Sequence, residues 1–292
     1  MYSHIQERRK RIRPVKFDYR YMTIKDFGEI DNNRIRLYCI RNSRGSEVKI
    51  TNYGSMLTSW ITQDNLGNFT DVLSGFDNLQ QCMHQQGYVL NNSDFKKARW
   101  NVEIAEDHSL LLHYEWSGYC NHQPVKTNVT RHYKYTDEDE LIIEDKASSN
   151  NTAIPDLTND FRFKLGDAIS NHEIMINASR NCYVNVISQD NKIATGVSFD
   201  LKGGRLISDI TDEVNLRDGI NYILRGKNVF SSPSATLTSY NTGRRLEIYT
   251  NHSSLFFSAD NQSVCLKPNC TNKVLDQSCT FHSITKYKIV HF

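Results

Sequence analysis

Apolar and polar residues alternate along most of this chain with a period of two, which is typical of β-strands that bury one face. The clearest example is residues 47–53, where Val48 and Ile50 stand between polar residues until Gly54 ends the pattern. The same alternation predicts strands over residues 56–62, 100–105, 109–116, 125–135, 140–144, 173–178, 183–187, 234–240, 244–250, 254–258, 263–266 and 280–291. Turn residues separate these segments at spacings of roughly 8–12 residues, which predicts an all-β sandwich or barrel. Because no long apolar period of 3.6 residues occurs, helices should be minor.

Length and composition agree with one large folded unit. Of the 292 residues, 38% are hydrophobic and 23% are charged, which is too apolar for a disordered chain. The sequence contains no internal repeat and no linker. We therefore expect a basic, partly disordered tail over residues 1–34 and a single β-sandwich domain over residues 35–292. No run of about 20 apolar residues is present, so the sequence predicts no transmembrane helix and no membrane partner.

The charge of the chain argues against a broad nucleic-acid surface, with one local exception. There are 35 basic and 33 acidic residues, whereas nucleic-acid binders usually show a basic domain or stripe. The exception is a basic cluster near the N-terminus, formed by Arg8, Arg9, Lys10, Arg11 and Arg13. This cluster is either a solvated tail or an arm for nuclear import or nucleic-acid binding. No apolar signal segment accompanies it, so we expect a cytoplasmic protein that reaches the nucleus only through this cluster.

Cysteine content and motif content exclude several kinds of site. The seven cysteines are an odd number, and the sequence contains no C-x-x-C pair and no Cys/His cluster of zinc-site spacing. Without a secretion signal they should be reduced thiols, mostly small core residues. The sequence also lacks a glycine-rich nucleotide loop, a G-x-S-x-G nucleophile motif and an H-E-x-x-H metal motif. The motifs alone therefore identify no metal, cofactor or nucleophile.

A series of short segments, taken in order, is similar to a known family. The series begins with Thr51-Asn52-Tyr53-Gly54 and residues 70–77, and continues with Phe95-Lys96-Lys97-Ala98-Arg99-Trp100. Its later members are residues 156–165, 171–178, 193–201, 242–250 and 265–269. In this order and spacing the segments resemble the aldose 1-epimerases, or galactose mutarotases, over residues 35–292. The resemblance implies a large antiparallel β-sandwich of the galactose mutarotase type, with a sugar site on a concave sheet face. It implies no cofactor and no metal.

The resemblance also implies where catalysis should occur, and there the sequence departs from the family. Members open and reclose a pyranose ring with a glutamate base and a histidine acid. The base position is Lys267 in this chain, and the acid position is Asp160. A sugar-binding aspartate of the family is replaced by Asn221. The family's G-R-x-A-N-R segment has no counterpart, because too few residues separate residue 76 from residue 95.

Two further residues are candidates for binding a sugar. Asn159 belongs to the same segment as Asp160. His84 is either a remnant of the family's second histidine or a loop residue with no role. The remaining histidines near predicted strands carry no motif, and we interpret them as surface or cross-strand residues: His113, His122 and His132.

Three functions are compatible with these substitutions. A lysine is ordinarily charged at neutral pH and cannot accept a proton, so the first hypothesis is a monomeric, sugar-binding protein of mutarotase type that has lost turnover. The first alternative is an active, remodelled hexose epimerase with Asp160 as base and Lys267 as acid. The second alternative is a protein-interaction or nucleic-acid adaptor on the same scaffold.

The alignment makes two structural predictions. Asp160 and Lys267 should point into one groove within about 8 Å of each other and form an ion pair, because a partly buried charge is costly alone. The short crossing over residues 78–97 should leave this groove more open than in the family, since a chain of that length spans the sheet only once.

Overall fold

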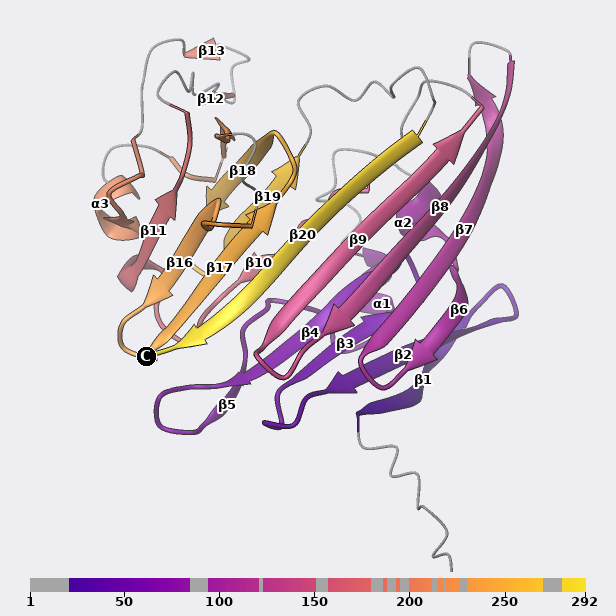
Figure 1. Ribbon diagram of the computed structural model, residues 1–292, viewed down its shortest axis with the longest axis horizontal. Helices are drawn as coiled ribbons and strands as arrows, with labels where there is room; N and C mark the ends of the chain where they lie inside the picture. The colour runs from indigo at the N-terminus through magenta and orange to yellow at the C-terminus, as the bar shows by residue number, and fades with distance from the viewer. Residues whose placement is uncertain are drawn as a thin grey trace, which may run out of the picture.

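The computed structural model describes residues 21–84, 94–120, 123–150, 157–179, 186–187, 193–194, 200–211, 215–217, 219–225, 230–269 and 280–292. Its largest element is a nine-stranded antiparallel sheet, which crosses the view in Figure 1 from β11 to β6. The strands lie in the order β14 (Arg205–Leu206), β11 (His172–Ile176), β16 (Ala235–Ser239), β17 (Arg244–Thr250), β20 (Thr280–His291), β9 (Glu140–Ser149), β8 (Gln123–Tyr135), β7 (Ser109–Cys120) and β6 (Asn101–Glu106).

Two smaller sheets form the opposite layer. The first contains β1 (Met22–Ile30), β2 (Asn33–Arg41), β3 (Glu47–Thr51), β4 (Met56–Gln63) and β5 (Phe69–Asp71) in chain order. The second has the order β10 (Arg162–Phe163), β19 (Val264–Asn269), β18 (Ser254–Ala259) and β15 (Ile220–Ile223). Leu73 bridges to Phe163, so the chain that leaves β5 joins the two sheets. A further pair is formed by β12 (Val186–Ile187) and β13 (Ile193–Ala194).

The core lies between these two layers and follows the period-two pattern. On β8, Val129 and Tyr133 are fully buried, and on β9, Leu141 takes the equivalent inward position. These residues belong to one apolar cluster with residues of the opposite layer, including Trp60 and Phe257. Because successive strand residues point to opposite faces, each long strand contributes every second side chain to this core. The all-β sandwich expected from the sequence is confirmed.

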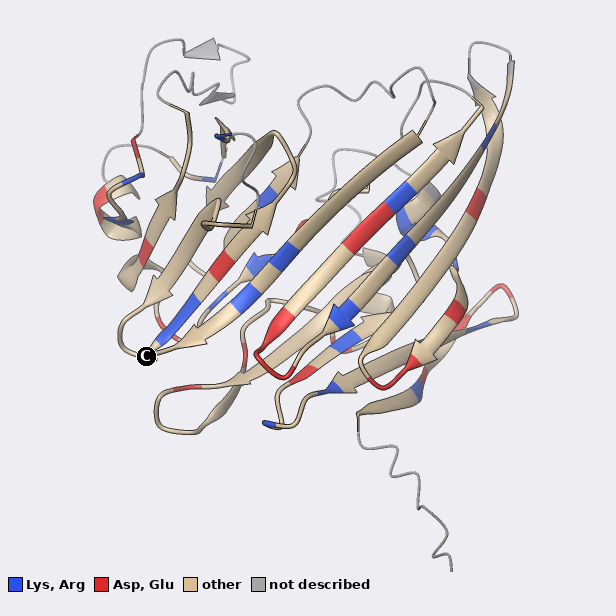
Figure 2. Ribbon diagram, viewed as in Figure 1, with Lys and Arg blue, Asp and Glu red and all other residues tan. Residues whose placement is uncertain are grey.

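The outward positions of the same strands carry charge. Lys286 and Lys288 of β20 both contact Glu140 of β9, at 3.3 and 3.1 Å. Figure 2 shows basic residues along β20 and mainly acidic residues along the neighbouring β9. The polar half of the pattern therefore faces solvent, where such ion pairs add little stability.

The sheets begin earlier in the chain than expected. Strand β1 pairs with β2 from Met22 onward, so the strands start at residue 22 rather than at residue 35. The alternation of β1 is weak because it is an edge strand and most of its side chains are exposed. Its turn to β2 is the pair Asp31-Asn32, with φ of 50° and 59°, as a two-residue hairpin requires. The basic cluster at residues 8–13 lies outside the described residues.

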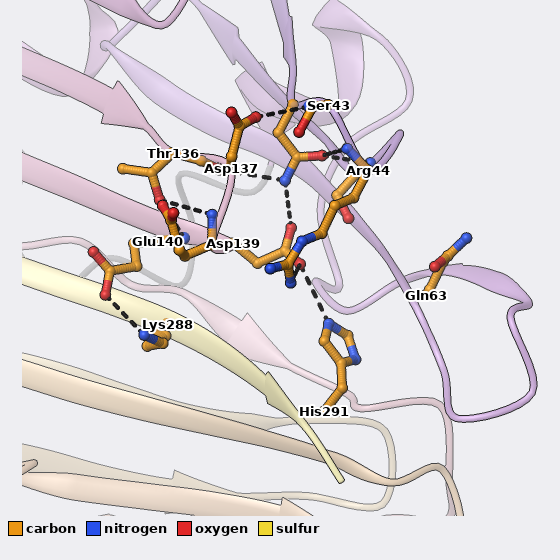
Figure 3. A network of polar contacts seen from close by, with 12 residues as sticks. Ser43, Arg44, Gln63, Thr136, Asp137, Asp139, Glu140, Lys288 and His291 are labelled. Carbon is orange, nitrogen blue, oxygen red and sulfur yellow. Dashed lines mark hydrogen bonds and ion pairs between the residues drawn. The ribbon is translucent and has the colours of Figure 1, made fainter.

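A buried carboxylate ties three parts of the sandwich together at the turn between β8 and β9 (Figure 3). Asp139 accepts hydrogen bonds from Asn42 at 2.7 Å and from the Tyr135 hydroxyl at 2.8 Å. His291 at the end of β20 lies 3.3 Å from its second oxygen. Burial alone would raise the pKa of Asp139, but the hydrogen bonds from His291 and its other donors outweigh burial and lower that pKa.

Among the described residues the helices are short, as expected: α1 (Leu79–His84), α2 (Asp94–Lys97), α3 (Ile207–Thr211) and a 3₁₀ turn (Ile169–Asn171). Within the described residues, none is long and apolar enough to cross a membrane. Cys39, Cys82 and Cys265 are free and buried, which confirms for these three the prediction of reduced core thiols.

Candidate functional site

Asp160 forms ion pairs with two lysines at once. Lys267 Nζ lies 2.7 Å from Asp160 Oδ1, and Lys96 Nζ lies 3.1 Å from Asp160 Oδ2. Each lysine side chain is 19% exposed and that of Asp160 is 31% exposed, so the cluster is partly desolvated. The ion pair expected between Asp160 and Lys267 is confirmed, whereas Lys96 was not anticipated. We call Asp160, Lys96 and Lys267 the ion triad.

Strand register places the ion triad beside an aromatic ring and an amide. Lys267 on β19 lies opposite Phe256 on β18, and Phe256 lies opposite Asn221 on β15. Residues directly opposite in antiparallel strands have Cβ atoms about 4.5–5.5 Å apart and point to the same face. Their chain neighbours Leu266 and Phe257 are fully buried. The row Asn221–Phe256–Lys267 therefore lies on the side of this sheet that points away from the core.

Phe256 is held in place by a glycine. Gly219 has a φ of +75°, and a Cβ on it would lie 2.0 Å from the tip of the Phe256 ring. The ring therefore lies directly against the Gly219 backbone, at the start of β15. Phe256 is half-buried and stands apart from the apolar core cluster. Its ring is thus positioned as a partly exposed surface between Asn221 and Lys267.

A buried arginine fixes the loop that carries Asp160. Arg131 donates from Nη1 to Asn159 Oδ1 at 2.9 Å and from Nη2 to the Leu157 carbonyl oxygen. Arg131 also bonds the carboxylate of Asp145, which lies directly opposite on β9, and its Nη1 lies 3.4 Å from the Ser55 carbonyl oxygen. Burial alone would lower the pKa of Arg131, but the Asp145 carboxylate outweighs this effect and raises it. Asn159, expected to bind a sugar, uses its carboxamide oxygen to anchor this loop.

His252 lies near the same buried pair. Burial lowers the pKa of His252, an effect that Asp145 opposes and Arg131 reinforces. Its ring also contacts Phe281, with centroids 6.4 Å apart. The imidazole is therefore biased toward its neutral form.

A close backbone approach brings Lys96 to Asp160. Gly54 has a φ of +64°, and a Cβ on it would lie 2.3 Å from the Lys96 carbonyl oxygen. The Gly54 amide donates to the Ala98 carbonyl at 2.7 Å, and the Trp100 amide donates to the Asn52 carbonyl at 2.8 Å. Two of the family-like segments, at residues 51–54 and 95–100, are thus docked on one another. A third and a fourth, at residues 156–165 and 265–269, meet them at the ion triad.

Cys265 lies two residues before Lys267 on β19, close to the Asp160 carboxylate. It is opposite Arg162 of β10 in register, and it is almost fully buried. Burial, together with the nearby Asp160 carboxylate, raises the pKa of the Cys265 thiol to about 11. The thiol is therefore protonated at neutral pH and is a poor nucleophile.

His84 is the one predicted site residue whose described contacts stay local. It is exposed at the end of α1, and its Nδ1 lies 2.7 Å from the carbonyl oxygen of Gln80. Residues 85–93 of the crossing between α1 and α2 lie outside the described residues, so the expected opening of the groove is untested. Among the residues that the structure describes, no group of three or more His, Cys, Asp or Glu side chains could hold a metal.

Sequence reasoning missed Lys96, Arg131, Asp145 and Phe256. The sequence does contain a sign of the buried ion pair. Arg131 and Asp145 occupy positions at which the period-two pattern of β8 and β9 otherwise places apolar residues. Lys96 lies in a quoted segment, but only the docking of that segment on Gly54 brings it to Asp160.

Comparisons with known proteins agree with this fold. The GalM/aldose epimerase homologue from C. elegans is 16% identical, with a TM-score of 0.72 over 87% of this chain and 98% of that one. The galactose 1-epimerase from Lactobacillus acidophilus NCFM is also 16% identical, with a TM-score of 0.72 over 92% and 98%. A galactose mutarotase-like protein from Clostridium acetobutylicum is 11% identical, with a TM-score of 0.61 over 93% and 99%. No curated protein sequence matches the chain significantly.

The family profile described as aldose 1-epimerase matches residues 80–282, which is more than half of the chain. The match spans all but the first of the segments that meet at the ion triad, and the sandwich agrees with the fold of the similar solved structures. The chain belongs to the aldose 1-epimerase family.

Proposed function

We propose that this protein binds carbohydrate at the face formed by Asn221, Phe256 and the ion triad, and that it does not catalyse mutarotation of the bound sugar. The observation that carries this proposal is the contact between Lys267 and Asp160 at 2.7 Å. These are the two positions that the family resemblance assigns to the catalytic base and acid. In this chain they are bonded to each other rather than presented separately to a ligand.

The ion triad is unsuited to mutarotation. The reaction needs one group to take a proton from the anomeric hydroxyl while another gives a proton to the ring oxygen. An ion pair favours the charged form of both partners. A charged ammonium has no lone pair to accept a proton, and an ionised carboxylate has no proton to give. If a sugar bound as the family resemblance implies, the pair would occupy the space of its reacting atoms.

Several features support retained binding of a sugar. Phe256 offers an apolar ring face, and Asn221 beside it carries both a donor and an acceptor for hydroxyl groups. Asn269, two residues beyond Lys267 on β19, has a buried Oδ1 with no hydrogen-bond partner among the described residues. A sugar hydroxyl would supply the missing donor. Polar groups beside an aromatic surface are typical of sites for small polar ligands.

Polarimetry of freshly dissolved α-D-galactose and α-D-glucose tests the loss of turnover. The full chain should leave the rate of mutarotation at its spontaneous value, while the Lactobacillus acidophilus galactose 1-epimerase, assayed in parallel, should accelerate it. Acceleration by this protein that disappears in Asp160→Asn would overturn the proposal and favour the active, remodelled epimerase. A binding titration with the same sugars tests the other half of the proposal.

We further propose that the protein acts as a monomer in the cytoplasm. The basic cluster at residues 8–13 is the segment through which nuclear import or nucleic-acid contact would occur. Light scattering tests the oligomeric state. Nuclear localisation and nucleic-acid binding, compared between the full chain and a variant carrying Arg8→Gln, Arg9→Gln and Lys10→Gln, test whether the cluster has either role.

A further inference from the structure

We propose that His172 is a pH-sensitive latch, whose neutral imidazole closes the connection between β10 and β11 and whose protonation on Nε2 opens it. The inference concerns residues 164–172 and does not depend on the proposed function. It rests on the hydrogen bonds of one side chain at the start of β11, which is fully buried with 0% of His172 exposed.

The two ring nitrogens of His172 meet backbone groups of opposite kind. Nδ1 lies 3.0 Å from the Ala168 carbonyl oxygen, which can only accept a hydrogen bond, so Nδ1 carries the proton. Nε2 lies 3.3 Å from the Leu165 amide nitrogen, which can only donate, so Nε2 is the unprotonated acceptor. These contacts select the neutral imidazole in one tautomer. A second proton, on Nε2, would face the buried Leu165 N–H, and two donors would then point at each other.

The contact between His172 and Leu165 holds a junction of the β10–β11 connection with β17 and β4. The Leu165 carbonyl oxygen accepts hydrogen bonds from Arg244 Nη1 at 3.2 Å and from the Thr242 hydroxyl at 2.9 Å. Arg244, on β17, also donates from Nη2 to the Thr62 carbonyl oxygen of β4 at 2.9 Å. A movement of the Leu165 peptide away from a protonated His172 would therefore disturb the contacts of the Arg244 guanidinium.

The surroundings of His172 favour its neutral form. Burial is the largest effect and lowers the pKa of His172, while the Ala168 carbonyl and the Asp167 carboxylate raise it. Asp167 is engaged by the Ala168 amide at 2.7 Å and by the Asn241 side chain at 2.8 Å. Further charged side chains on the elements around this connection are Asp64, Lys164, Glu173, Arg205, Asp209 and Arg244.

The direction of the pH dependence follows from this environment. The opened connection returns the imidazole to water and to the ordinary histidine pKa of 6.5, whereas the closed connection holds its pKa below that value. As the pH falls below 6.5, the open form therefore takes up a proton that the closed form does not, and the equilibrium moves toward opening. The latch is closed above this pH and loosens below it.

Hydrogen exchange of single amides, measured by NMR on the full chain, tests the latch. After correction for the intrinsic exchange rate, protection of the Leu165 amide should fall between about pH 7 and pH 5, by at most about tenfold for each pH unit. The Trp100 amide is the control, because it donates to the Asn52 carbonyl at 2.8 Å and neither group titrates. Its protection should stay constant over the same range.

Variants assign the effect to one imidazole. His172→Gln removes the titrating group, so protection of the Leu165 amide should no longer depend on pH in this range. His113→Gln, on β7, removes an imidazole elsewhere and should leave the pH dependence at Leu165 unchanged. If His172→Gln does not fold, the nitrogen NMR shifts of His172 in the unaltered protein decide, because Nε2 should carry no proton at neutral pH.

Three results would overturn the proposal. The first is protection of the Leu165 amide that stays constant in acid, or that falls equally in His172→Gln. The second is a proton on Nε2 of His172 at neutral pH. The third is an equal loss of protection at the Trp100 amide, which would show that acid unfolds the whole domain rather than opening one connection.

Discussion

Arg131 and Asp145 face each other across β8 and β9 and form a two-pronged ion pair, with Nε–Oδ1 at 2.6 Å and Nη2–Oδ2 at 2.8 Å. Only 5% of each side chain is exposed. The same guanidinium holds Asn159 and the Leu157 carbonyl oxygen, so the loop that presents Asp160 is anchored to a buried charge pair. In this sandwich the position of the ion triad depends on residues inside the core.

Removal of one member of this pair should destabilise the whole domain. Arg131→Met leaves the Asp145 carboxylate buried and uncompensated, which costs about 3–5 kcal/mol of the free energy of unfolding. Urea denaturation followed by circular dichroism measures this loss. The double variant Arg131→Met with Asp145→Leu should be more stable than Arg131→Met alone, because no isolated charge remains. A double variant as unstable as the single one would contradict this account of the pair.

Stability should fall in acid because of Asp139. Its folded pKa is lowered below the ordinary value of 3.8, so its contribution is present above that pH and is lost as the pH falls through the folded pKa. Thermal unfolding measured between pH 6 and pH 2, a range of about four units around the ordinary aspartate pKa, should show a declining midpoint. Asp139→Asn should flatten the acid end of this curve. An unchanged slope in Asp139→Asn would assign the acid sensitivity to other carboxylates.

Gly54 and Gly67 provide a matched pair of backbone tests. Both have positive φ, +64° and +84°, but a Cβ on Gly54 would lie 2.3 Å from the Lys96 carbonyl oxygen, whereas a Cβ on Gly67 meets nothing within 4 Å. Gly67→Ala should therefore cost only backbone strain, about 1 kcal/mol. Gly54→Ala must also push α2 away, and it should cost at least about 1–2 kcal/mol more than Gly67→Ala. Equal losses in denaturation experiments would show that the 95–100 segment is not docked here.

Restoring the family's acid and base should not by itself restore mutarotation. In the double variant Lys267→Glu with Asp160→His, both groups have the chemistry that the family resemblance assigns to these positions, but we expect Asn221 and the missing G-R-x-A-N-R segment to leave the sugar poorly oriented. Since orientation contributes as much to the rate as the proton transfers do, polarimetry should show at most a small acceleration. Addition of Asn221→Asp should increase it further. A double variant with full family activity would show that orientation is not the missing component.

The sequence alone determined where most of the half-buried strands lie and which family the chain resembles. Alternation along residues 244–250 and 280–291 predicts strands whose observed bounds are identical, since half of each strand is buried and the period-two signal is strong. The resemblance was enough to identify the family and to indicate that residues 160 and 267 lie together, because their segments pair through β10 and β19. Strand β1 was missed because an exposed edge strand has little reason to alternate.

The tertiary structure decided which groups share a site and what each one does there. Asn159 and Asp160 are neighbours in the chain, yet one contacts a buried arginine and the other contacts two lysines. Lys96 reaches Asp160 only because Gly54 lets a helix approach the backbone closely. Phe256 gains its place from cross-strand register, which joins residues 221, 256 and 267 in one row. Sequence patterns report the face of an element that each residue occupies, whereas partners across sheets depend on packing of the whole chain, and no local pattern encodes that packing.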